Sequence, residues 1–139
     1  MSLDPAALPE PVLAFLRERH LATLTTLRAD GSPHVVPVGF TWDEDVHVVR
    51  VITHGSSVKA RNARRGGRAA VSHVDGRRWI TLEGPSRVLT TPEEVREAER
   101  RYALRYRQPR VNPQRVVVVI DVDRVLSGSW SQAGPGKAP

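Results

Sequence analysis

The sequence predicts a mainly β domain, a small barrel of six or so antiparallel strands with about three short helices. Short runs rich in Val, Ile and Thr recur at regular spacing, and turn signals such as Asp30-Gly31 and Asp75-Gly76 separate them. A basic helix interrupts these runs in mid-chain, so it splits the sheet instead of flanking it. The 139 residues suffice for one core without metals or disulfides. We therefore expect one domain over residues 1–130 and a disordered Gly/Pro/Ala-rich tail at 131–139.

The first half of the chain is expected to hold one helix and three strands ahead of the basic helix. Val12, Phe15 and Leu16 lie at mostly helical spacing. The segments that follow are rich in Thr and aliphatic residues, and the Asp43-Glu-Asp45 loop between two of them is expected to be a solvent-exposed hairpin tip. The expected elements are a helix at 9–20 and strands at 21–27, 34–42 and 46–53.

The second half is expected to alternate strands with one amphipathic helix. Gly84-Pro85 interrupts a long apolar run and predicts a bulge or bend. Thr91-Pro-Glu-Glu94 is a capping box, and the apolar face of the helix behind it predicts docking on a sheet. The expected elements are strands at 68–74 and 77–90, a helix after Thr91, a loop at 109–113 and a final strand at 115–126.

The most informative segment joins a strand to the basic helix. From Val46 to Val74 the chain has no Asp or Glu and carries the cations Arg50, Lys59, Arg61, Arg64, Arg65 and Arg68. With Ser56 or Ser57 as the expected N-cap, hydroxyls, free amide groups and an ammonium converge at one turn. Such a turn is an anion cradle suited to a phosphate. From composition alone, a basic helix face without a ligand is an equally good interpretation.

Composition narrows the classes of function. The chain has no cysteine, which excludes thiol nucleophiles, Cys-ligated zinc and disulfides. A net charge of +6 and a pI near 10.9 favour anionic partners. Aromatic residues make up only 5% and none lies in the basic segment, which argues against nucleic acid. Because no apolar run has the length of a signal peptide or a membrane span, we expect a cytoplasmic protein without membrane contact.

Motifs for chemistry carried by the protein itself are missing. The five histidines show no metal-ligand spacing, so no metal site is predicted. The sequence has no nucleophile elbow, no Walker loop and no dinucleotide-binding glycine motif. An enzyme without these groups takes its reactivity from a bound cofactor.

The cradle and three longer segments resemble a known family. Thr53 is followed by Ser57 four positions on and by Lys59 two further, a spacing similar to the phosphate site of the pyridoxamine 5′-phosphate oxidase-like split-barrel family. Segments that resemble its coenzyme F420-dependent, deazaflavin-using branch are 20–40, 71–84 and 98–107. Within that branch the sequence most closely resembles the F420-dependent biliverdin reductases. The similarity extends from Leu13 to Leu126.

This resemblance implies a split β-barrel homodimer with the cofactor in a groove between the subunits. By resemblance, Thr53, Ser57 and Lys59 bind the phosphate, and His34 and Arg78 are candidate contacts for the substrate. The other implied cofactor-binding positions are Arg61 and Asn62 on the helix, His34, Val35, Val36, Pro37 and Val38 along the ring, and Arg78 and Trp79 from the second subunit. The residues alone leave alternatives open, because the positions 35–38 also suit a plain core, Asn62 a polar helix position and Trp79 a buried anchor.

The implied activity is hydride transfer from reduced coenzyme F420 to an organic acceptor, with no catalytic residue beyond the cofactor. The implied acceptor is biliverdin, a tetrapyrrole, which is reduced to bilirubin. Val58 stands where FMN-using relatives often carry Arg, and the arginines on the next helix turn suit the oligoglutamate tail of F420, which FMN lacks. Three alternatives stay open: an FMN enzyme of the pyridoxamine-phosphate oxidase type, a non-catalytic cofactor- or haem-binding module on the same fold, and, least favoured, binding of nucleic acid.

Overall fold

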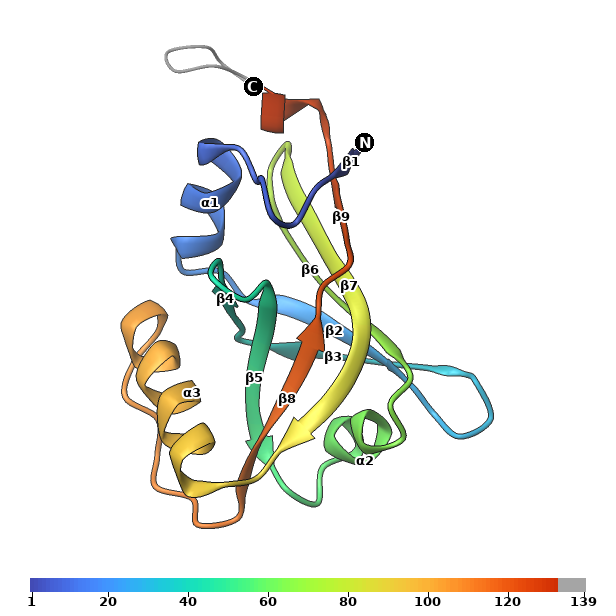
Figure 1. The fold of residues 1–139 in the computed structure, drawn as a ribbon, viewed down its shortest axis with the longest axis vertical. Helices are drawn as coiled ribbons and strands as arrows, with labels where there is room; N and C mark the ends of the chain where they lie inside the picture. The colour runs from blue at the N-terminus through green and yellow to red at the C-terminus, as the bar shows by residue number, and fades with distance from the viewer. Residues whose placement is uncertain (133–139) are drawn as a thin grey trace.

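The computed structural model describes residues 1–132, which form nine strands, three α-helices and one 3₁₀ helix (Figure 1). The strands are β1 (Ser2–Leu3), β2 (Ala22–Leu27), β3 (Pro33–Val38), β4 (Thr41–Asp43), β5 (Val48–His54), β6 (Arg68–Asp75), β7 (Arg78–Leu89), β8 (Arg115–Asp121) and β9 (Arg124–Ser127). The helices are α1 (Glu10–Arg17), α2 (Val58–Arg64), α3 (Pro92–Arg105) and η1 (Ser129–Gln132). All strand pairs within residues 1–132 are antiparallel, so the predicted mainly β class is confirmed.

The strands form one strongly curved sheet in the order β3-β2-β6-β7-β8-β5-β4, with β9 paired to β7 and β1 paired to β9. β3 and β4 follow each other in the chain, yet they lie at opposite ends of this order. Because no hydrogen-bonded ladder joins these two ends in residues 1–132, the barrel is split there. In Figure 1, α3 lies beside β5 and β8, and α2 lies at the lower end of the barrel.

β7 belongs to both halves of the sheet and changes partners near its middle. Its residues 78–85 pair with β6, whereas 86–89 pair with β8. At Gly84 an added Cβ would lie 1.9 Å from the carbonyl oxygen of Asp121, so only glycine allows this close backbone approach. The interruption predicted at Gly84-Pro85 is therefore the point where one continuous strand passes between the two halves.

The core fills the barrel and includes apolar side chains of α1, while α2 and α3 pack on the sheet from different sides. Phe15, Leu24, Val51, Ile80 and Leu82 are buried inside. α2 buries two alanines and an asparagine against β2, β7 and β8. α3 packs on the outside of β5 and β8 through Ala98 and the partly buried Val95, and this docking on a sheet was predicted from its apolar face.

Four details differ from the sequence-based expectation. The run 34–42 breaks into β3 and β4, and the run 115–126 breaks into β8 and β9 at Val122 and Asp123, whose amides bond to carbonyls outside either strand. Asp43, expected in a solvent-exposed tip, is 4% exposed because it receives ion pairs from two arginines. Ser131 and Gln132, expected in the disordered tail, belong to η1, while the rest of that tail lies outside the described residues. Among residues 1–132, no helix is long and apolar enough to cross a membrane.

Candidate functional site

A pocket of about 400 Å³ lies where the end of β3, the end of β5, α2 and the segment after α3 meet. β3 contributes Pro37 and Val38, β5 contributes Ile52 and Thr53, and α2 contributes Lys59. The far wall consists of Tyr102 on α3 and residues from the segment Arg107–Arg115. The pocket therefore unites two positions of the predicted phosphate cradle with two of the predicted ring-contacting positions.

The cradle itself is built by the turn between β5 and α2. The Thr53 hydroxyl donates to the Ser57 Oγ at 3.1 Å, and Ser57 in turn caps α2 by accepting from the amide of Ala60 at 3.3 Å. Ser57, not Ser56, is thus the N-cap. The amide of Gly55 donates to the carbonyl of Gln114 at 2.8 Å, which ties this turn to the segment after α3. These bonds fix the hydroxyl groups beside Lys59.

Lys59 is a half-buried cation without an acidic partner among residues 1–132. Burial lowers the pKa of Lys59 below its ordinary value, because the desolvated ammonium loses hydration and gains no counter-charge. An anion bound beside the ammonium would restore that charge balance. The chemistry of a hydroxyl pair next to an uncompensated ammonium fits a phosphate group.

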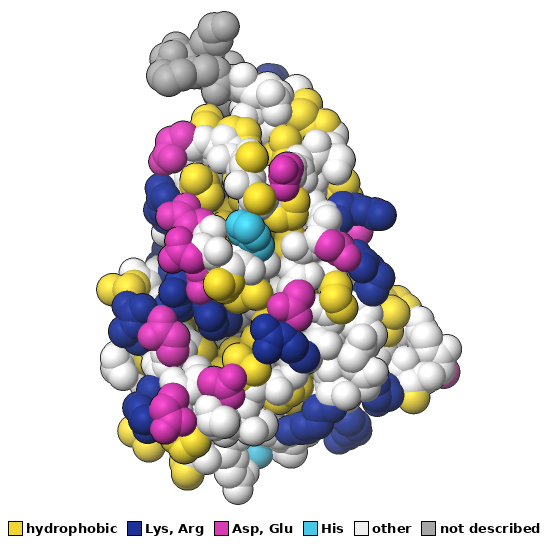
Figure 2. Space-filling view, viewed as in Figure 1, with side chains coloured by type: hydrophobic (Ala, Val, Ile, Leu, Met, Phe, Trp, Pro, Cys, Tyr) yellow, Lys and Arg dark blue, Asp and Glu magenta, His cyan; other side chains and the backbone are white. Residues whose placement is uncertain are grey.

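The Lys, Arg, Asp and Glu side chains that line the pocket are all cationic. These are Lys59, Arg107, Arg110 and Arg115, and no Asp or Glu is among the lining residues. Arg115 pairs with Glu99 at 2.5 Å, so one of the three arginines is already neutralised. Figure 2 shows positive side chains gathered over α2, where Arg61, Arg64 and Arg65 are exposed, whereas positive and negative side chains alternate along α3.

The predicted ring-contacting strand reaches the pocket only with its end. β3 is an edge strand, paired with β2 alone, and alternate residues of such a strand turn their backbone groups away from the partner. Prolines at 33 and 37 cannot donate, and they suit the side that faces away from β2. By this alternation Val35 and Pro37 present backbone groups at the free edge, whereas Val36 and Val38 pair with β2. His34 does not line the pocket, and its Nδ1 is buried without a hydrogen-bond partner.

Two of the predicted α2 positions point away from the pocket. Asn62 is 4% exposed, and its amide donates to the Thr26 hydroxyl at 2.9 Å inside the barrel. Arg65 donates to the Asn62 side-chain carbonyl and to the carbonyl of Leu27. Arg61 is exposed and does not line the pocket. In this structure Asn62 therefore joins α2 to β2, which is the alternative that the sequence left open.

Arg78 and Trp79 lie on the β6–β7 hairpin, away from the residues that line the pocket of the same subunit. The guanidinium of Arg78 donates to Glu18 at 2.8 and 3.0 Å and to Asp75 at 2.6 Å, and it stacks over the Phe15 ring. Trp79 is 36% exposed on the outer face of the sheet. A role for either residue at the pocket would therefore need a second subunit, and the assignment that the resemblance implies for them stays a prediction.

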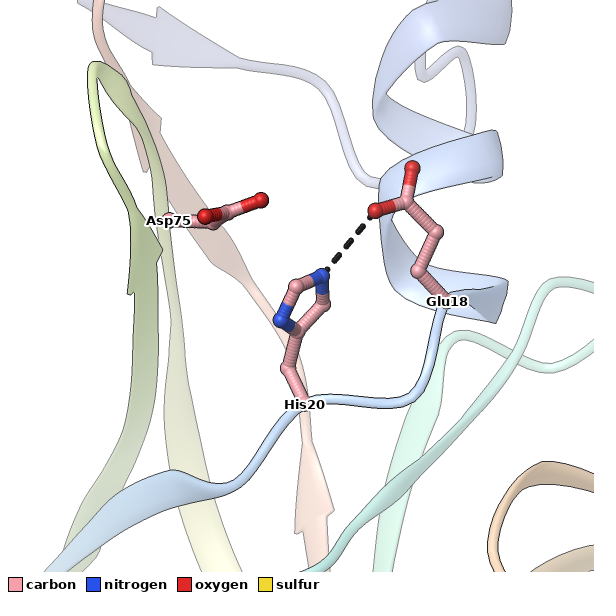
Figure 3. Close-up of side chains that lie close together, drawn as sticks. All are labelled: Glu18, His20 and Asp75. Carbon is pink, nitrogen blue, oxygen red and sulfur yellow. Dashed lines mark hydrogen bonds and ion pairs between the residues drawn. The ribbon is translucent and has the colours of Figure 1, made fainter.

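One cluster of possible metal ligands occurs in the described residues, formed by Glu18, His20 and Asp75 (Figure 3). The His20 Nε2 and a Glu18 carboxylate oxygen lie 3.0 Å apart. Arg78 occupies both carboxylates, and its hydrogen bond is the main reason that the pKa of Glu18 falls to about 2. The cluster is therefore an ion-pair network that joins the end of α1 to the β6–β7 hairpin.

The segment after α3 starts from a fixed point beside the end of β3. Arg105 donates to the carbonyls of Glu18 and Phe40 at 2.8 and 2.5 Å, and the Tyr106 hydroxyl donates to the carbonyl of His20 at 2.7 Å. At Gly39 an added Cβ would lie 3.1 Å from the rings of Tyr102 and Tyr106. These contacts hold the start of the segment against the barrel.

Sequence reasoning missed the contribution of this segment to the site. From Arg100 to Ile120 the chain has no Asp or Glu, just as in the stretch 46–74 around the cradle. The same signal that identified the cradle therefore occurs a second time, and the two acid-free stretches meet in one pocket.

Fold and site together define the chain as a split β-barrel protein with a cationic pocket beside its phosphate-type turn. It belongs to the pyridoxamine 5′-phosphate oxidase family, which it matches over residues 8–127. It is 58% identical over 122 residues to the F420H2-dependent biliverdin reductase of Mycobacterium tuberculosis (strain CDC 1551 / Oshkosh), which covers 88% of this chain and 89% of that protein. The predicted membership of this family is confirmed.

Solved structures share the same fold at lower identity. A conserved hypothetical protein of Mycobacterium tuberculosis aligns with a TM-score of 0.75 at 23% identity, over 94% of this chain and 90% of that one. An F420 reductase aligns with a TM-score of 0.67 at 24% identity, over 81% of this chain and 94% of that one. At these identities the likeness establishes the fold.

Proposed function

We propose that this protein is an F420H2-dependent reductase that transfers a hydride to an organic acceptor, with biliverdin as the acceptor and bilirubin as the product. One structural observation carries the proposal. The pocket sets Thr53 and Lys59 beside the end of β3, and its lining holds four cationic side chains and no acidic one. The activity named for the relative with 58% identity supports deazaflavin over FMN as the cofactor.

The residues of the cradle would hold the phosphate of the cofactor. Lys59 supplies the positive charge, and Thr53 and Ser57 supply hydroxyl groups whose positions the chain has already fixed by hydrogen bonding. Ile52, Val38 and Tyr102 form a wall that limits water around the ring. When bound, the reduced deazaflavin supplies the hydride, and the protein supplies position and charge.

The proton that accompanies the hydride comes from solvent in this proposal. No Asp or Glu lines the pocket, and the Nδ1 of His54, the histidine among the lining residues, is hydrogen-bonded to the amide and the side chain of Ser56. Lys59 is committed to the phosphate. A turnover rate that stays constant across the pH range in which the protein is folded would agree with this assignment.

We propose that the chain acts as a homodimer. On β2, β3 and β6 the outward side chains alternate with core residues, are exposed or half-exposed, and carry no charge over most of the face. These outward residues are Thr23, Thr25, Leu27, Pro33, Val35, Pro37, Ala70, Ser72 and Val74. An uncharged sheet face of this kind suits a self-complementary, two-fold interface. Trp79 lies at the margin of this sheet face and would reach the partner. The enzyme is expected to work in the cytoplasm.

A cofactor screen followed by turnover tests the proposal. The purified protein is titrated separately with F420 and with FMN, and binding is followed by the fluorescence of each ligand. We expect F420 to bind, and F420H2 to be consumed only when biliverdin is added, with one bilirubin formed per F420H2. Tight binding of FMN without binding of F420 would overturn the proposal in favour of an FMN enzyme. Bound F420 without turnover would favour a non-catalytic cofactor-binding module.

A further inference from the structure

The segment between α3 and β8 carries two arginines that have no partner in the described residues. Arg107 and Arg110 are exposed, line the pocket and make neither an ion pair nor a side-chain hydrogen bond within residues 1–132. The neighbouring arginines along the chain are all engaged. Arg96, Arg100 and Arg101 pair with glutamates of α3, Arg105 donates to two backbone carbonyls, and Arg115 pairs with Glu99.

The segment that carries them is fixed at both ends. Arg105 and Tyr106 hold its start against the barrel, as described above. At its other end the amides of Gln114 and Arg115 donate to the side chain and the carbonyl of Asn112, and the Gly55 amide donates to the carbonyl of Gln114. Pro109 and Pro113 restrict the backbone between these anchors. Because the segment is already ordered, little conformational entropy is lost when a ligand binds to it.

The positive charge of the pocket exceeds the need of one phosphate. A phosphodiester carries a single negative charge, which Lys59 and the hydroxyls of the cradle match. Arg107 and Arg110 are then left facing the same pocket without a counter-charge. A planar guanidinium favours carboxylates, which it binds through two parallel hydrogen bonds.

We infer that Arg107 and Arg110 form a carboxylate-binding wall opposite the phosphate cradle. The inference rests on the proposed function, since that function supplies two ligands with carboxylates: the glutamate tail of the cofactor and the propionates of the tetrapyrrole. It moves carboxylate binding from the arginines of α2 and from Arg78, where the sequence placed it, to the segment after α3, while the phosphate stays at Lys59. Arg61 and Arg64 do not line the pocket, Arg65 is bonded to Leu27 and Asn62, and Arg78 is bonded to two carboxylates.

The test replaces both arginines in the full chain with Arg107→Gln and Arg110→Gln. A charge-matched control carries Arg19→Gln and Arg100→Gln, which are exposed and do not line this pocket. Thermal melting first establishes that both double variants fold as the wild type does. Binding is then measured by fluorescence with F420 and with a deazaflavin that lacks glutamates, and turnover is measured with biliverdin and with its dimethyl ester.

The expected loss is about tenfold for each arginine that contacts a carboxylate. A loss of affinity for tailed F420 alone identifies the cofactor tail as the source of the carboxylate. A raised KM for biliverdin, with the KM for the dimethyl ester unchanged, identifies the acceptor. If neither value differs from that of the control, or if the ligands without carboxylates suffer equally, the inference is overturned while the reductase activity stands.

A probe that is independent of the enzyme reaction separates the two hypotheses. Triglutamate is titrated into the protein without cofactor and followed by calorimetry. We expect weak binding to the wild type and the control, and no detectable binding to the Arg107/Arg110 variant. If the wild type binds FMN and not F420, the proposed function fails, and the triglutamate titration still decides whether the wall binds carboxylates. No difference between the two double variants in that titration would refute the wall.

Discussion

Around α1 and along the inner side of α3, arginines contact carboxylates, whereas in the pocket most cations contact none. We call the first region the paired flank and define it as Glu18, Asp43, Arg50, Asp75, Arg78 and Arg101. Its N–O distances are 2.6 to 3.2 Å. In the pocket, Lys59, Arg107 and Arg110 have no carboxylate partner among residues 1–132. Both regions thus contain cationic side chains, but in the paired flank carboxylates neutralise them and in the pocket most have no counter-charge.

The difference separates charges that stabilise the fold from charges that are available to a ligand. In the flank, hydrogen bonding to Arg78 lowers the pKa of Glu18 to about 2, so the pair is held in its ionised form. In the pocket, burial lowers the pKa of Lys59, so the charged ammonium is destabilised until an anion binds beside it. Changes in the flank should therefore affect stability, and changes in the pocket should affect binding.

The largest expected effect is on stability and follows Asp43→Ala. Asp43 accepts from Arg50 at 2.8 Å and lies 3.2 Å from Arg101, and its side chain is 6% exposed. Removal of the carboxylate leaves the Arg50 guanidinium without a carboxylate partner and leaves Arg101 with Glu97 alone, which costs about 3 kcal/mol. Chemical denaturation measures the loss, and Asp45→Ala, an exposed neighbour, is the control. A loss no greater than that of the control would show that the flank does not stabilise the fold.

Next in size is the loss of cofactor affinity after Lys59→Ala. The charge-assisted contact with the phosphate is worth about 2 kcal/mol, or roughly a thirtyfold rise in Kd for F420. The free energy of unfolding should stay the same or increase, because a half-buried cation without a partner is removed. Fluorescence titration and denaturation measure the two quantities, and Lys59→Arg retains the charge as a control. Unchanged affinity would mean that the cradle lies elsewhere.

A moderate effect is expected on the pH dependence of stability. The pKa of His73, which burial lowers to about 3, lies below its unfolded value near 6.5, so the unfolded state binds protons first and stability falls as the pH drops below about 6.5. For Asp43, burial alone would raise the pKa, but hydrogen bonds from Arg50 and the Asp45 amide lower it overall. The folded pKa values of Asp43 and Glu18 lie below the unfolded ones, so their contribution is present above about pH 4 and is lost toward pH 2.

The free energy of unfolding, measured by denaturation from pH 8 to pH 3, separates the contribution of His73 from that of the two carboxylates. His73→Gln should reduce the fall in the free energy of unfolding between pH 6.5 and pH 4. Glu18→Gln should lower the free energy of unfolding above pH 4 by about 1 kcal/mol. The effect is no larger because solvent screens a carboxylate whose side chain is 43% exposed. A profile of the wild type that stays flat down to pH 4 would contradict the role of buried His73.

The smallest effect is expected from the double substitution Arg61→Gln and Arg64→Gln on α2. Both side chains are exposed and lie outside the pocket lining, so stability should change by less than about 0.5 kcal/mol. Affinity for tailed F420 should change less than twofold. A large loss of that affinity would show that the glutamate tail of F420 binds to α2, as the sequence alone suggested, and would contradict its binding to Arg107 and Arg110.

The sequence predicted most strands and the turn that builds the cradle because both depend on local order, whereas phosphate binding at that turn stays a prediction. Alternating apolar residues and Asp-Gly turns determine strands nearby in the chain, and Thr53, Ser57 and Lys59 meet within one turn. It could not predict partners that lie far apart. Arg78 meets Glu18 across 60 residues, and this long-range pairing removes it from the set of available cations. On α2, a single position separates Arg61, which faces solvent, from Asn62, which faces Thr26.

The breaks in the long apolar runs were equally invisible. Phe40 and Val122 are apolar residues of the kind that strands contain, so nothing local marks the breaks beside them. The rings of Tyr102 and Tyr106, which come close to Gly39 between β3 and β4, are more than 60 residues away in the chain. Conversely, the second acid-free stretch was visible in the sequence from the start. Its meaning depended on knowing that it folds back against the first.

The prolines of β3 have a further consequence for the behaviour of the protein at high concentration. An exposed strand edge invites pairing with strands of other molecules, and this is a common start of amyloid-like aggregation. On the free edge of β3, Pro33 and Pro37 leave Val35 as the single residue with an outward amide hydrogen. A foreign strand therefore finds too few donors to extend the sheet. The edge thus resists fibre growth without involving the uncharged sheet face that the proposed dimer would use.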